Sequence, residues 1–428
     1  MGEYTWPRGA EAFDSFEYHA REYSRVAAGI ERPAELRHAL ALCESRLQEI
    51  VATIPDNFLS YDRFMMVIPK LNMASTPGYP YCLDKPTIGQ WLGWDGFQAR
   101  AENLERLWFD CNLVIENKYD HIMKSFIKME PHKLSKAKLR RWRIIIGFSL
   151  PVQVVWKMLF DYTNDLMVKR AYETPLQHGL VLFEGGWKQY LRQWKSQGYN
   201  SGTDASAWDW TVSGWLVDAV LELRTRLVRG NEETMRTWTR IARQLYTSAF
   251  SRARILLPSG ELLQQEFDGL QKSGSPNTIS DNSMMRYIAS IIVTLRLEWP
   301  IRAGVFCGDD ALESLPDDVD SVNALIKNYR DLGIIIKSVE RGLEFVGHKF
   351  TDKGPIPLYL GKHLWKLKYT KEEDLATFLD AMCRLYCHCE HFALWEFLAR
   401  RLGVQVYSRS YYLDWYDFEI EPQYRGLL

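Results

Sequence analysis

Two acidic segments of the sequence carry side chains that can bind metal ions. Asp204 and Asp209 lie in GTDASAWDW, and Asp309 and Asp310 lie in VFCGDDALE. Carboxylate oxygens are ligands that Mg²⁺ prefers, and a protein usually supplies one or two of them while phosphates and water complete the shell. Two such ions, about 3.5–4 Å apart, can activate an attacking hydroxyl and stabilise a leaving pyrophosphate. The pattern therefore predicts a two-metal site that joins nucleotides, with Asp204, Asp309 and Asp310 as metal ligands.

The segment QKSGSPNTISDNS, between the acidic segments, makes this prediction more specific. Gly-Asp is ordinary turn chemistry, so GDD alone is weak evidence. Thr278 and Asn282 lie four residues apart on a predicted helix and share one face, which together with Asp209 can bind a ribose hydroxyl. Ser273 and Gly274 precede them in a loop flexible enough to approach a substrate. The alternative is structural, because Ser and Thr residues here would cap the following helix in any protein.

Two stretches are strongly basic although the whole chain is not. The formal net charge is −1, so a nucleic-acid partner would be held by local patches. Residues 128–143 (KMEPHKLSKAKLRRWR) and residues 362–371 (KHLWKLKYTK) are such patches. Lys128 and Arg143 are candidates for binding a triphosphate, because a guanidinium group matches phosphate geometry. The alternative is a solvated face or a general nucleic-acid patch.

Length and composition indicate a globular protein of two or three subdomains, with 428 residues of which 46% are apolar. Seven unevenly spaced cysteines favour a reducing compartment over a disulfide framework. There is no apolar run of about 18 residues, and Trp6 replaces the Ser or Thr of a myristoylation motif. We therefore expect no intrinsic membrane anchor. Cys383, Cys387 and His391 have a spacing that could bind zinc on one helix, but helix packing is the favoured interpretation.

Hydrophobic periodicity and turn residues predict a mixture of helices and strands without regular alternation, which is typical of an α+β fold. Asp209 or Thr211 is expected to cap the helix that follows the first acidic segment. The expected helices cover 31–52, 98–118, 151–170, 210–228, 232–249, 277–297 and 372–402, the last as one helix or a broken pair. The expected strands cover 143–148 and 199–206, with hairpins in 252–267 and around Gly308-Asp309.

Six motifs, taken in order, resemble those of the RNA-dependent RNA polymerases of positive-strand RNA viruses, most closely the sobemovirus/polerovirus-like group. The resemblance runs over roughly residues 75–350. The motifs are STPGYPY (75–81), IKMEPHKLSKAKLRRWRIII (127–146), DASAWDW, QKSGSPNTISDNS, GDD, and GIIIKSVERGLEFVGHKF (333–350).

This resemblance implies a right-hand polymerase fold with an antiparallel palm sheet and a helical thumb. The implied regions are fingers with an N-terminal extension (1–150), palm (151–228 and 269–352), a fingers insertion (229–268) and thumb (353–428). It implies that Thr76, Gly78 and Pro80 guide the template and that Lys337 protonates the leaving pyrophosphate. Lys128 and Arg143 would bind the triphosphate. The ribose would be read by Asp209, Ser273, Thr278 and Asn282, and Gly274 would bind the substrate beside them.

The implied activity is RNA-directed RNA synthesis with two Mg²⁺ ions, for which Mn²⁺ can substitute. The implied partners are template and product RNA, NTPs, other viral replication proteins and a genome-linked protein primer, with de novo initiation left open. The implied location is the host cytoplasm, in replication complexes that partners recruit to membranes. Two alternatives stay open: a reverse transcriptase, for which Tyr-x-Asp-Asp would be expected in place of Cys307-Gly308-Asp-Asp, and a catalytically silent RNA-binding component.

Overall fold

The computed structural model describes residues 3–301 and 304–420, in which helices and strands alternate irregularly. This confirms the predicted α+β class. The first part contains β1 (Tyr4–Thr5), α1 (Ala12–Ala28), α2 (Leu36–Arg46), β2 (Ala52–Thr53), α3 (Tyr61–Val67), α4 (Ile88–Leu92), α5 (Ala101–Ile115), β3 (Ile122–Ile127), β4 (His132–Lys133), α6 (Leu134–Ala137), β5 (Ile144–Gly147) and α7 (Leu150–Lys169). The middle part contains α8 (Gly186–Ser196), β6 (Ser201–Ala205), α9 (Trp208–Thr211), α10 (Gly214–Arg226), β7 (Val228–Arg229), α11 (Glu232–Tyr246), β8 (Arg254–Leu256) and β9 (Leu262–Gln264). The last part contains α12 (Thr278–Arg296), β10 (Val305–Cys307), β11 (Asp310–Glu313), α13 (Val319–Asp331), β12 (Ile336–Arg341), β13 (Glu344–Phe345), β14 (His348–Thr351), β15 (Gly354–Pro357), α14 (Leu360–Lys368), α15 (Leu375–Leu385), α16 (Phe392–Arg401) and α17 (Arg409–Asp417).

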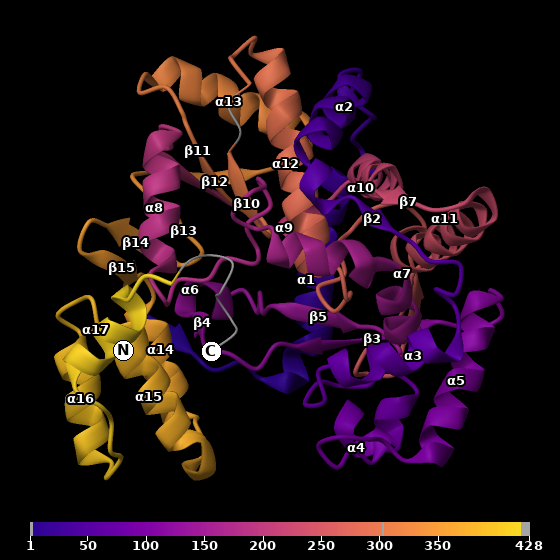
Figure 1. The fold of residues 1–428 in the computed structure, drawn as a ribbon, viewed down its shortest axis with the longest axis horizontal. Helices are drawn as coiled ribbons and strands as arrows, with labels where there is room; N and C mark the ends of the chain where they lie inside the picture. Colours follow the sequence, from indigo (N-terminus) through magenta and orange to yellow (C-terminus); the bar gives the residue numbers. More distant parts are fainter. Residues whose placement is uncertain (1–2, 302–303, 421–428) are drawn as a thin grey trace.

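Two four-stranded sheets organise the described part of the chain. The first is antiparallel and has the order β10-β11-β6-β12, so β6 lies between the strands that follow it by about a hundred residues or more. The second has the order β5-β3-β8-β9. Strands β8 and β9 form the predicted hairpin of 252–267, and β8 pairs with β3, which precedes the first basic stretch in the chain. In Figure 1, β10–β12 lie together with α12 and α13, α3–α5 lie at the opposite side, and α14–α17 form a separate helical group.

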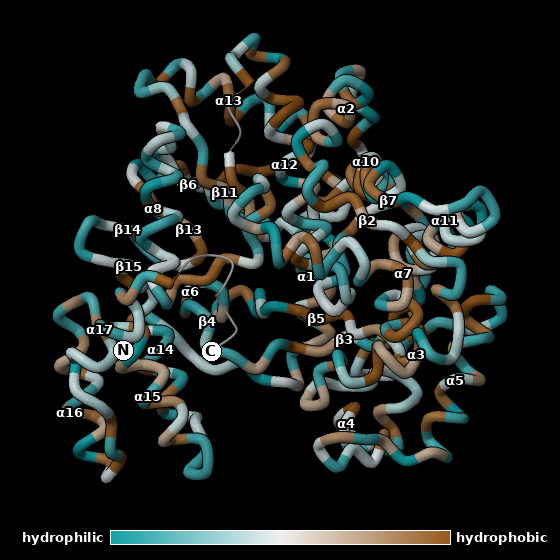
Figure 2. Tube along the Cα trace, in the orientation of Figure 1, coloured by the Kyte–Doolittle hydropathy of each residue, from teal (hydrophilic) through white to brown (hydrophobic). Residues whose placement is uncertain are grey.

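The described residues form two hydrophobic cores, and the larger one is built mainly around the long helices α7 and α12. Helix α7 begins after Ser149 with Pro151 in its first turn, where a missing N–H costs nothing, and it buries Trp156 and Phe160 fully. Helix α12 is buried along nearly its whole length, including the polar residues of its first turns. Figure 2 shows apolar segments running along β5 and α12. Because α12 packs against β10 and α2, it fixes the acidic hairpin to the rest of the molecule.

A second core joins the C-terminal helices to α8. Trp194 of α8 contacts the ring of Phe350 on β14, with centroids 4.8 Å apart, and both belong to the same buried cluster as Tyr386 and Trp395. The short sheet β13-β14-β15 stands between the central sheet and these helices. The helices α14–α17, which follow β15, therefore pack on this sheet through aromatic side chains.

Two expected helices are interrupted. The helix expected over 210–228 breaks between α9 and α10, because Val212 and Ser213 leave the helix to pair with the segment around Gly269. Neither Asp209 nor Thr211 caps α10, which begins after Ser213 without a side-chain cap. The helix expected over 372–402 ends at Leu385 and resumes at Phe392 as α16, so the expected broken pair is the observed form.

The expected helix over 31–52 is also shorter than predicted. It covers only α2, since Pro33 precedes it and a short 3₁₀ turn (Gln48–Ile50) and β2 follow it. No helix in the described ranges is long and apolar enough to cross a membrane. Gly2, the residue that a myristoylation motif would use, lies outside the described residues.

Candidate active site

The two acidic segments meet at one end of the central sheet. In the antiparallel ladder between β11 and β6, Ala311 lies opposite Thr203, so Asp310 and Asp204 follow at opposed positions. Opposed residues of such a ladder project from the same face. Asp309 lies in the β10–β11 turn after Gly308, whose φ of 65° is a conformation that glycine adopts without strain. The predicted metal ligands therefore belong to one strand end and one turn.

Helix α12 holds this turn in place from behind. The backbone N–H of Gly308 donates a 2.8 Å hydrogen bond to Ser283 Oγ, and Ser283 Oγ donates to the carbonyl of Ile279. Ser283 follows Asn282 directly, so the helix that carries Asn282 also fixes the Asp309–Asp310 turn. This bond was not predicted, because nothing in the sequence marks Ser283 as different from its neighbours.

The carboxylates of Asp204, Asp309 and Asp310 are crowded together. Burial raises the pKa of Asp310 to about 7, and the charges of Asp309 and Asp204 add to this effect. Burial also raises the pKa of Asp309, with a further contribution from Asp204. Since crowding and desolvation both disfavour the ionised form, a cation bound among these groups would stabilise all of them.

The donor set suits a hard metal ion that arrives with its substrate. Within residues 3–301 and 304–420, no three His, Cys, Asp or Glu side chains converge tightly enough to hold a metal ion by themselves. Mg²⁺ commonly takes only one or two carboxylates from a protein, and phosphate oxygens and water complete its shell. The open arrangement of Asp204, Asp309 and Asp310 therefore fits Mg²⁺ that is bound both by these carboxylates and by the phosphates of a nucleoside triphosphate.

Lys337 lies against the first of these carboxylates. Its Nζ is 2.5 Å from Asp204 Oδ2, and this contact raises the pKa of Lys337. The β12–β6 register shifts between Ile336, which pairs with Ala205, and Ser338, which pairs with Asp204. Lys337 is thus the extra residue of a bulge, and bulges commonly redirect a side chain next to an active site.

Asn282 and Asp209 also lie side by side. Asn282 Nδ2 donates to Asp209 Oδ1 over 3.4 Å, and Asn282 Oδ1 accepts a 2.9 Å bond from Gln271 Nε2. Burial raises the pKa of Asp209 to about 6, the Asp309 charge adds to this, and the Arg143 guanidinium opposes it. Gln271 was not predicted, because a glutamine before the Ser-Gly pair has no distinctive pattern.

The other three residues of this segment make contacts within the protein. Thr278 Oγ1 donates a 2.8 Å hydrogen bond to the carbonyl of Ser275. This is not a capping bond, in which the side chain accepts from a backbone N–H, and Asn277 makes no side-chain cap to α12. Ser273 Oγ donates to the carbonyl of Ile144. A Cβ added to Gly274 would lie 2.3 Å from the carbonyl oxygen of Ile146. The Ser-Gly loop therefore packs tightly against β5 in this structure.

The residues Lys128 and Arg143 meet at the ends of β3 and β5. The N–H of Lys128 donates to the carbonyl of Arg143 over 2.8 Å. Both side chains lie 3.5 Å from the carboxylate of Glu130. His132 fixes the backbone here, since its Nδ1 lies 2.7 Å from the Glu130 carbonyl and its Nε2 accepts from the N–H of Arg143 over 3.0 Å. That pattern requires neutral His132 with the proton on Nδ1, and burial lowers the His132 pKa in agreement.

The segment predicted to guide a template lies against the end of β5. Gly78 has a φ of 69°, and a Cβ there would lie 2.1 Å from the carbonyl oxygen of Phe148, so only glycine fits. The N–H of Gly78 donates to Thr76 Oγ1, and the peptide bond before Pro80 is cis. Thr76 and Gly78 thus shape a tight turn beside β5.

The cysteines near the C-terminus are packing residues. Helix α15 ends before Cys387, so Cys383, Cys387 and His391 do not share one helix as their spacing assumed. Cys387 is fully buried, its Sγ lies 3.4 Å from His388 Nδ1, and burial raises its pKa to about 12. His388 Nε2 in turn lies 2.9 Å from Asp417 Oδ1. The observed contacts support the packing interpretation.

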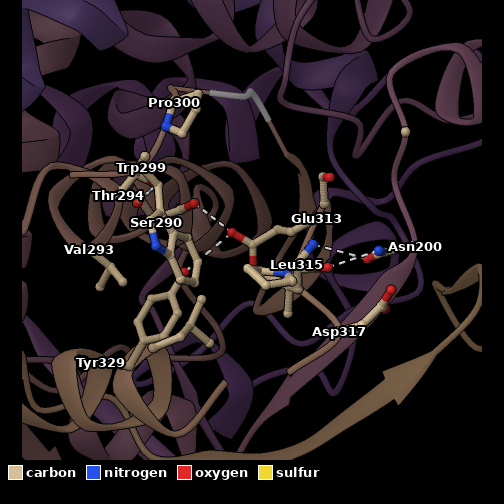
Figure 3. Close-up of a pocket in the computed structure, with 14 residues that line it drawn as sticks. Asn200, Ser290, Val293, Thr294, Trp299, Pro300, Glu313, Leu315, Asp317 and Tyr329 are labelled. Carbon is tan, nitrogen blue, oxygen red and sulfur yellow. Dashed lines mark hydrogen bonds between the residues drawn. The ribbon is translucent and has the colours of Figure 1, made fainter. Parts of the chain in front are cut away.

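A cavity of about 470 Å³ lies at the opposite end of the central sheet, between α12, α13 and the end of β11. Figure 3 shows Glu313 at its wall, accepting hydrogen bonds from Ser290 and Tyr329. Asn200 bonds to the backbone of Leu315 on the other side. These polar groups already bond to one another, and Asp204, Asp309 and Asp310 do not line the cavity, so it is not part of the acidic site.

Comparison with known proteins agrees with this geometry. A family model described as viral RNA-dependent RNA polymerase matches residues 61–359. The chain is 32% identical over 309 residues to protein P2-P3 of Poinsettia latent virus, which covers 68% of this chain and 26% of that protein. It is 28% identical over 257 residues to the RNA-directed RNA polymerase of Mushroom bacilliform virus, which covers 56% of this chain and 60% of that protein. The matched regions are thus less than two thirds of either relative's length.

The fold also matches that of a solved polymerase structure. The Sicinivirus 3Dpol RNA-dependent RNA polymerase has a TM-score of 0.70 with 16% sequence identity, covering 92% of this chain and 88% of that one. This likeness confirms the expected right-hand polymerase fold. The family match extends over more than half of the chain, and the related replicase proteins come from sobemovirus- and polerovirus-type viruses. The chain therefore belongs to the viral RNA-dependent RNA polymerase family, in its sobemovirus/polerovirus-like group.

Proposed function

We propose that this chain is an RNA-directed RNA polymerase that replicates and transcribes a positive-strand RNA genome. The observation that carries the proposal is the meeting of Asp204 with Asp309 and Asp310 beside the Asp209–Asn282 pair. In the proposed reaction the 3′-hydroxyl oxygen of an RNA strand forms a bond to the α-phosphorus of an NTP. The bond from that phosphorus to the bridging oxygen breaks, and pyrophosphate leaves.

Asp204, Asp309 and Asp310 would hold two Mg²⁺ ions, and Mn²⁺ can substitute because it prefers the same oxygen ligands. When bound, the ions supply Lewis acidity to the attacking hydroxyl and to the leaving pyrophosphate. The three aspartates orient these oxygens because their backbone is fixed by the β6–β11 ladder and by the Ser283–Gly308 bond.

Lys337 would donate the proton that the leaving pyrophosphate needs. Its support is its position, since the bulge in β12 brings its ammonium group to the Asp204 carboxylate. General acid catalysis of this kind contributes about 10²- to 10⁴-fold to a rate. The proton lost by the attacking hydroxyl passes to solvent or to a base supplied by the RNA or NTP.

Asp209 and Asn282 would read the ribose of the incoming nucleotide. An amide and a carboxylate held 3.4 Å apart can donate to and accept from a 2′-hydroxyl. A deoxyribonucleotide would leave this buried polar pair without its partner, which is how such a site rejects it. Ser273, Gly274 and Thr278 would assist by positioning this segment, in keeping with their contacts to β5 and to the helix start.

Arg143 and Lys128 would hold the triphosphate, and Thr76, Gly78 and Pro80 would guide the template beside β5. Arg143 lies near enough to the acidic site to influence Asp209 and Asp309 electrostatically. The proposed subdomains have the boundaries predicted from the sequence, namely fingers (1–150 and 229–268), palm (151–228 and 269–352) and thumb (353–428). The pairing of β8 with β3 supports the assignment of 229–268 to the fingers.

The proposed partners are template and product RNA, NTPs, other viral replication proteins and a genome-linked protein primer. The proposed location is the host cytoplasm, in complexes that such partners attach to membranes. Phosphate contacts by the basic stretches 128–143 and 362–371 would make RNA binding weaken steeply with salt.

The test is incorporation of labelled nucleotides by the purified chain on an RNA template with an annealed RNA primer. Ribonucleotides and deoxyribonucleotides would be compared with Mg²⁺ or Mn²⁺, beside an Asp309→Asn control of nearly equal shape. Metal-dependent extension with ribonucleotides only, lost in the control, is the expected result. Preference for deoxyribonucleotides would instead favour a reverse transcriptase, and RNA binding without extension under any condition would favour a silent binding protein.

A further inference from the structure

Glu130 is the one acidic side chain inside the first basic stretch, and it contacts three cations at once. Its Oε1 lies 3.5 Å from Arg143 Nη1, and its Oε2 lies 3.5 Å from the Nζ atoms of both Lys128 and Lys362. Lys362 belongs to α14, more than two hundred residues further along the chain. One carboxylate thus joins the two proposed triphosphate-binding residues to the C-terminal helical region.

These contacts are those of an exchangeable counterion. A distance of 3.5 Å is long for a charge-assisted hydrogen bond, which is commonly 2.7–2.9 Å, so each pair is held mainly by Coulomb attraction. The cations are also partly open to solvent, with 34–55% of their side chains exposed, whereas that of Glu130 is 21% exposed. Partly exposed pairs of this kind contribute little stability individually, and a triphosphate can therefore replace Glu130 on Lys128 and Arg143.

The backbone prevents Glu130 from moving far when that happens. The N–H of Glu130 donates to the carbonyl of Lys128, and the Glu130 carbonyl accepts from His132 Nδ1 over 2.7 Å. Pro131 follows and restricts the chain further. A displaced Glu130 carboxylate would therefore stay close to the incoming phosphates and repel them unless a cation offsets its charge.

Lys362 is in the right place to be that cation. The helix α14 that carries it is tied to the same part of the molecule by the N-terminal strand β1, which pairs with β4. The ring of Trp6 stacks on Tyr369 at the end of α14, with centroids 4.2 Å apart. A Cβ on Gly361 would lie 3.1 Å from the ring of Tyr4. Lys362 therefore remains beside Glu130 whichever partners Arg143 and Lys128 take.

We propose that Glu130 and Lys362 are positioning residues that set the affinity for the NTP. Glu130 competes with the triphosphate for Lys128 and Arg143, and Lys362 retains Glu130 when the triphosphate takes those two cations. The inference rests on the proposed function, because it assigns the triphosphate to Lys128 and Arg143. It adds that a residue of the C-terminal helical region, far from the reacting atoms, tunes nucleotide binding through a single carboxylate.

The test is a double-mutant cycle with Glu130→Gln, Lys362→Met and the double variant, in which KM for the NTP and kcat are measured on a primed RNA template. Glu130→Gln should lower KM about three- to fivefold, the range for one partly exposed ion pair. Lys362→Met should raise KM by a similar factor on the wild-type background and by almost nothing on the Glu130→Gln background. In every variant kcat should change less than KM.

The matched control is Lys353→Met, which changes an exposed lysine in the turn between β14 and β15, outside both basic stretches. It should leave KM unchanged. A rise in KM for Glu130→Gln, or an equal effect of Lys362→Met on both backgrounds, would overturn the inference. Glu130→Asp, which keeps the charge, should remain near wild type. If the glutamine variant misfolds, Glu130→Ala supplies the background without a carboxylate on which Lys362→Met should have almost no effect.

A binding measurement separates this inference from the proposed function. Fluorescence anisotropy of a labelled ATP, with Mg²⁺ present and inorganic tripolyphosphate as competitor, reports affinity without any RNA synthesis. If the wild type bound the probe but extended no primer, the proposed function would fail while the dissociation constants of the four proteins still decided the role of Glu130. Equal dissociation constants in all four would reject it even if synthesis were normal.

Discussion

Lys337 reaches Asp204 because β12 carries one residue more than its partner strand at that point. Ile336 and Ser338 pair with consecutive residues of β6, and Lys337 between them has no partner of its own. Its Nζ comes to 2.5 Å from Asp204 Oδ2. The proposed proton donor and a proposed metal ligand are thereby placed together by backbone geometry.

Replacing Lys337 should reduce turnover more than nucleotide affinity. In Lys337→Met the proposed proton donor is lost, so kcat should fall about 10²-fold or more at saturating NTP, while KM changes little. Lys337→Arg keeps the charge beside Asp204 but is a poor acid, so it should also have low kcat. The measurement is steady-state extension of a primed template. Full turnover by the arginine variant would show that only the charge of Lys337 matters.

Replacing Asn282 should weaken the discrimination between ribonucleotides and deoxyribonucleotides. Asn282→Ala removes the amide beside Asp209, so the ratio of kcat/KM for the two substrates should fall about three- to tenfold, as expected for one hydrogen bond. Gln271→Ala should give a smaller fall in the same direction, because Gln271 only orients Asn282. Competition between an NTP and its deoxy counterpart measures the ratio. An unchanged ratio in Asn282→Ala would remove Asn282 from the ribose site.

The sequence allowed the main elements and the acidic site to be predicted because local patterns specify both. The strand before Asp204, the hairpin around Gly308 and the long helix after Asn277 are all bounded by turn or cap residues and have clear periodicity. The meeting of Asp204 with Asp309 and Asp310 followed from motif order on a known fold. The register that pairs Thr203 with Ala311, and so brings Asp204 and Asp310 to the same end of the ladder, was visible only in the structure.

The features that could not be predicted depend on contacts between distant segments. The break before α10 arises because Ser213 pairs with Gly269, and no local pattern announces it. The sequence gives no role to Glu130, a single acidic residue in a basic stretch, because its contact with Lys362 joins segments that are distant in the chain. Ser273 and Gly274 were likewise misjudged from the sequence alone. Their residue types predicted a flexible loop, whereas in the structure they pack closely on β5.

Substituting Gly274 should destabilise the protein through that packing. In Gly274→Ala the new Cβ would lie 2.3 Å from the Ile146 carbonyl oxygen, a backbone atom that cannot move aside easily. Forced contacts of this size cost about 1–3 kcal/mol, so the melting temperature should fall and activity with it. Gly9→Ala is the control, because a Cβ at Gly9 meets nothing within 4 Å. Equal melting temperatures for both variants would contradict the close approach.

Lys272 should make stability depend on pH above neutrality. It is fully buried, and its Nζ donates to Gln265 Oε1 and to the carbonyls of Leu270 and Gly269, with no carboxylate among these partners. Burial lowers its pKa to about 7 from 10.5. Between those values the unfolded chain binds more protons than the folded one, so this group makes folding more favourable as pH rises. Below about pH 7 both states are protonated, and the folded state bears the full cost of the buried charge.

Lys272→Met should remove this pH dependence, which is measured by comparing the unfolding free energies of the variant and the wild type at several pH values. The difference in unfolding free energy, variant minus wild type, should decrease by about 1 kcal/mol per pH unit between pH 7.5 and 9.5. Loss of the three hydrogen bonds shifts this difference by a constant amount and does not change its slope. Lys366→Met, an exposed lysine, should give a difference that does not vary with pH. A flat difference for Lys272→Met as well would mean that the Lys272 amine keeps its ordinary pKa in the folded protein.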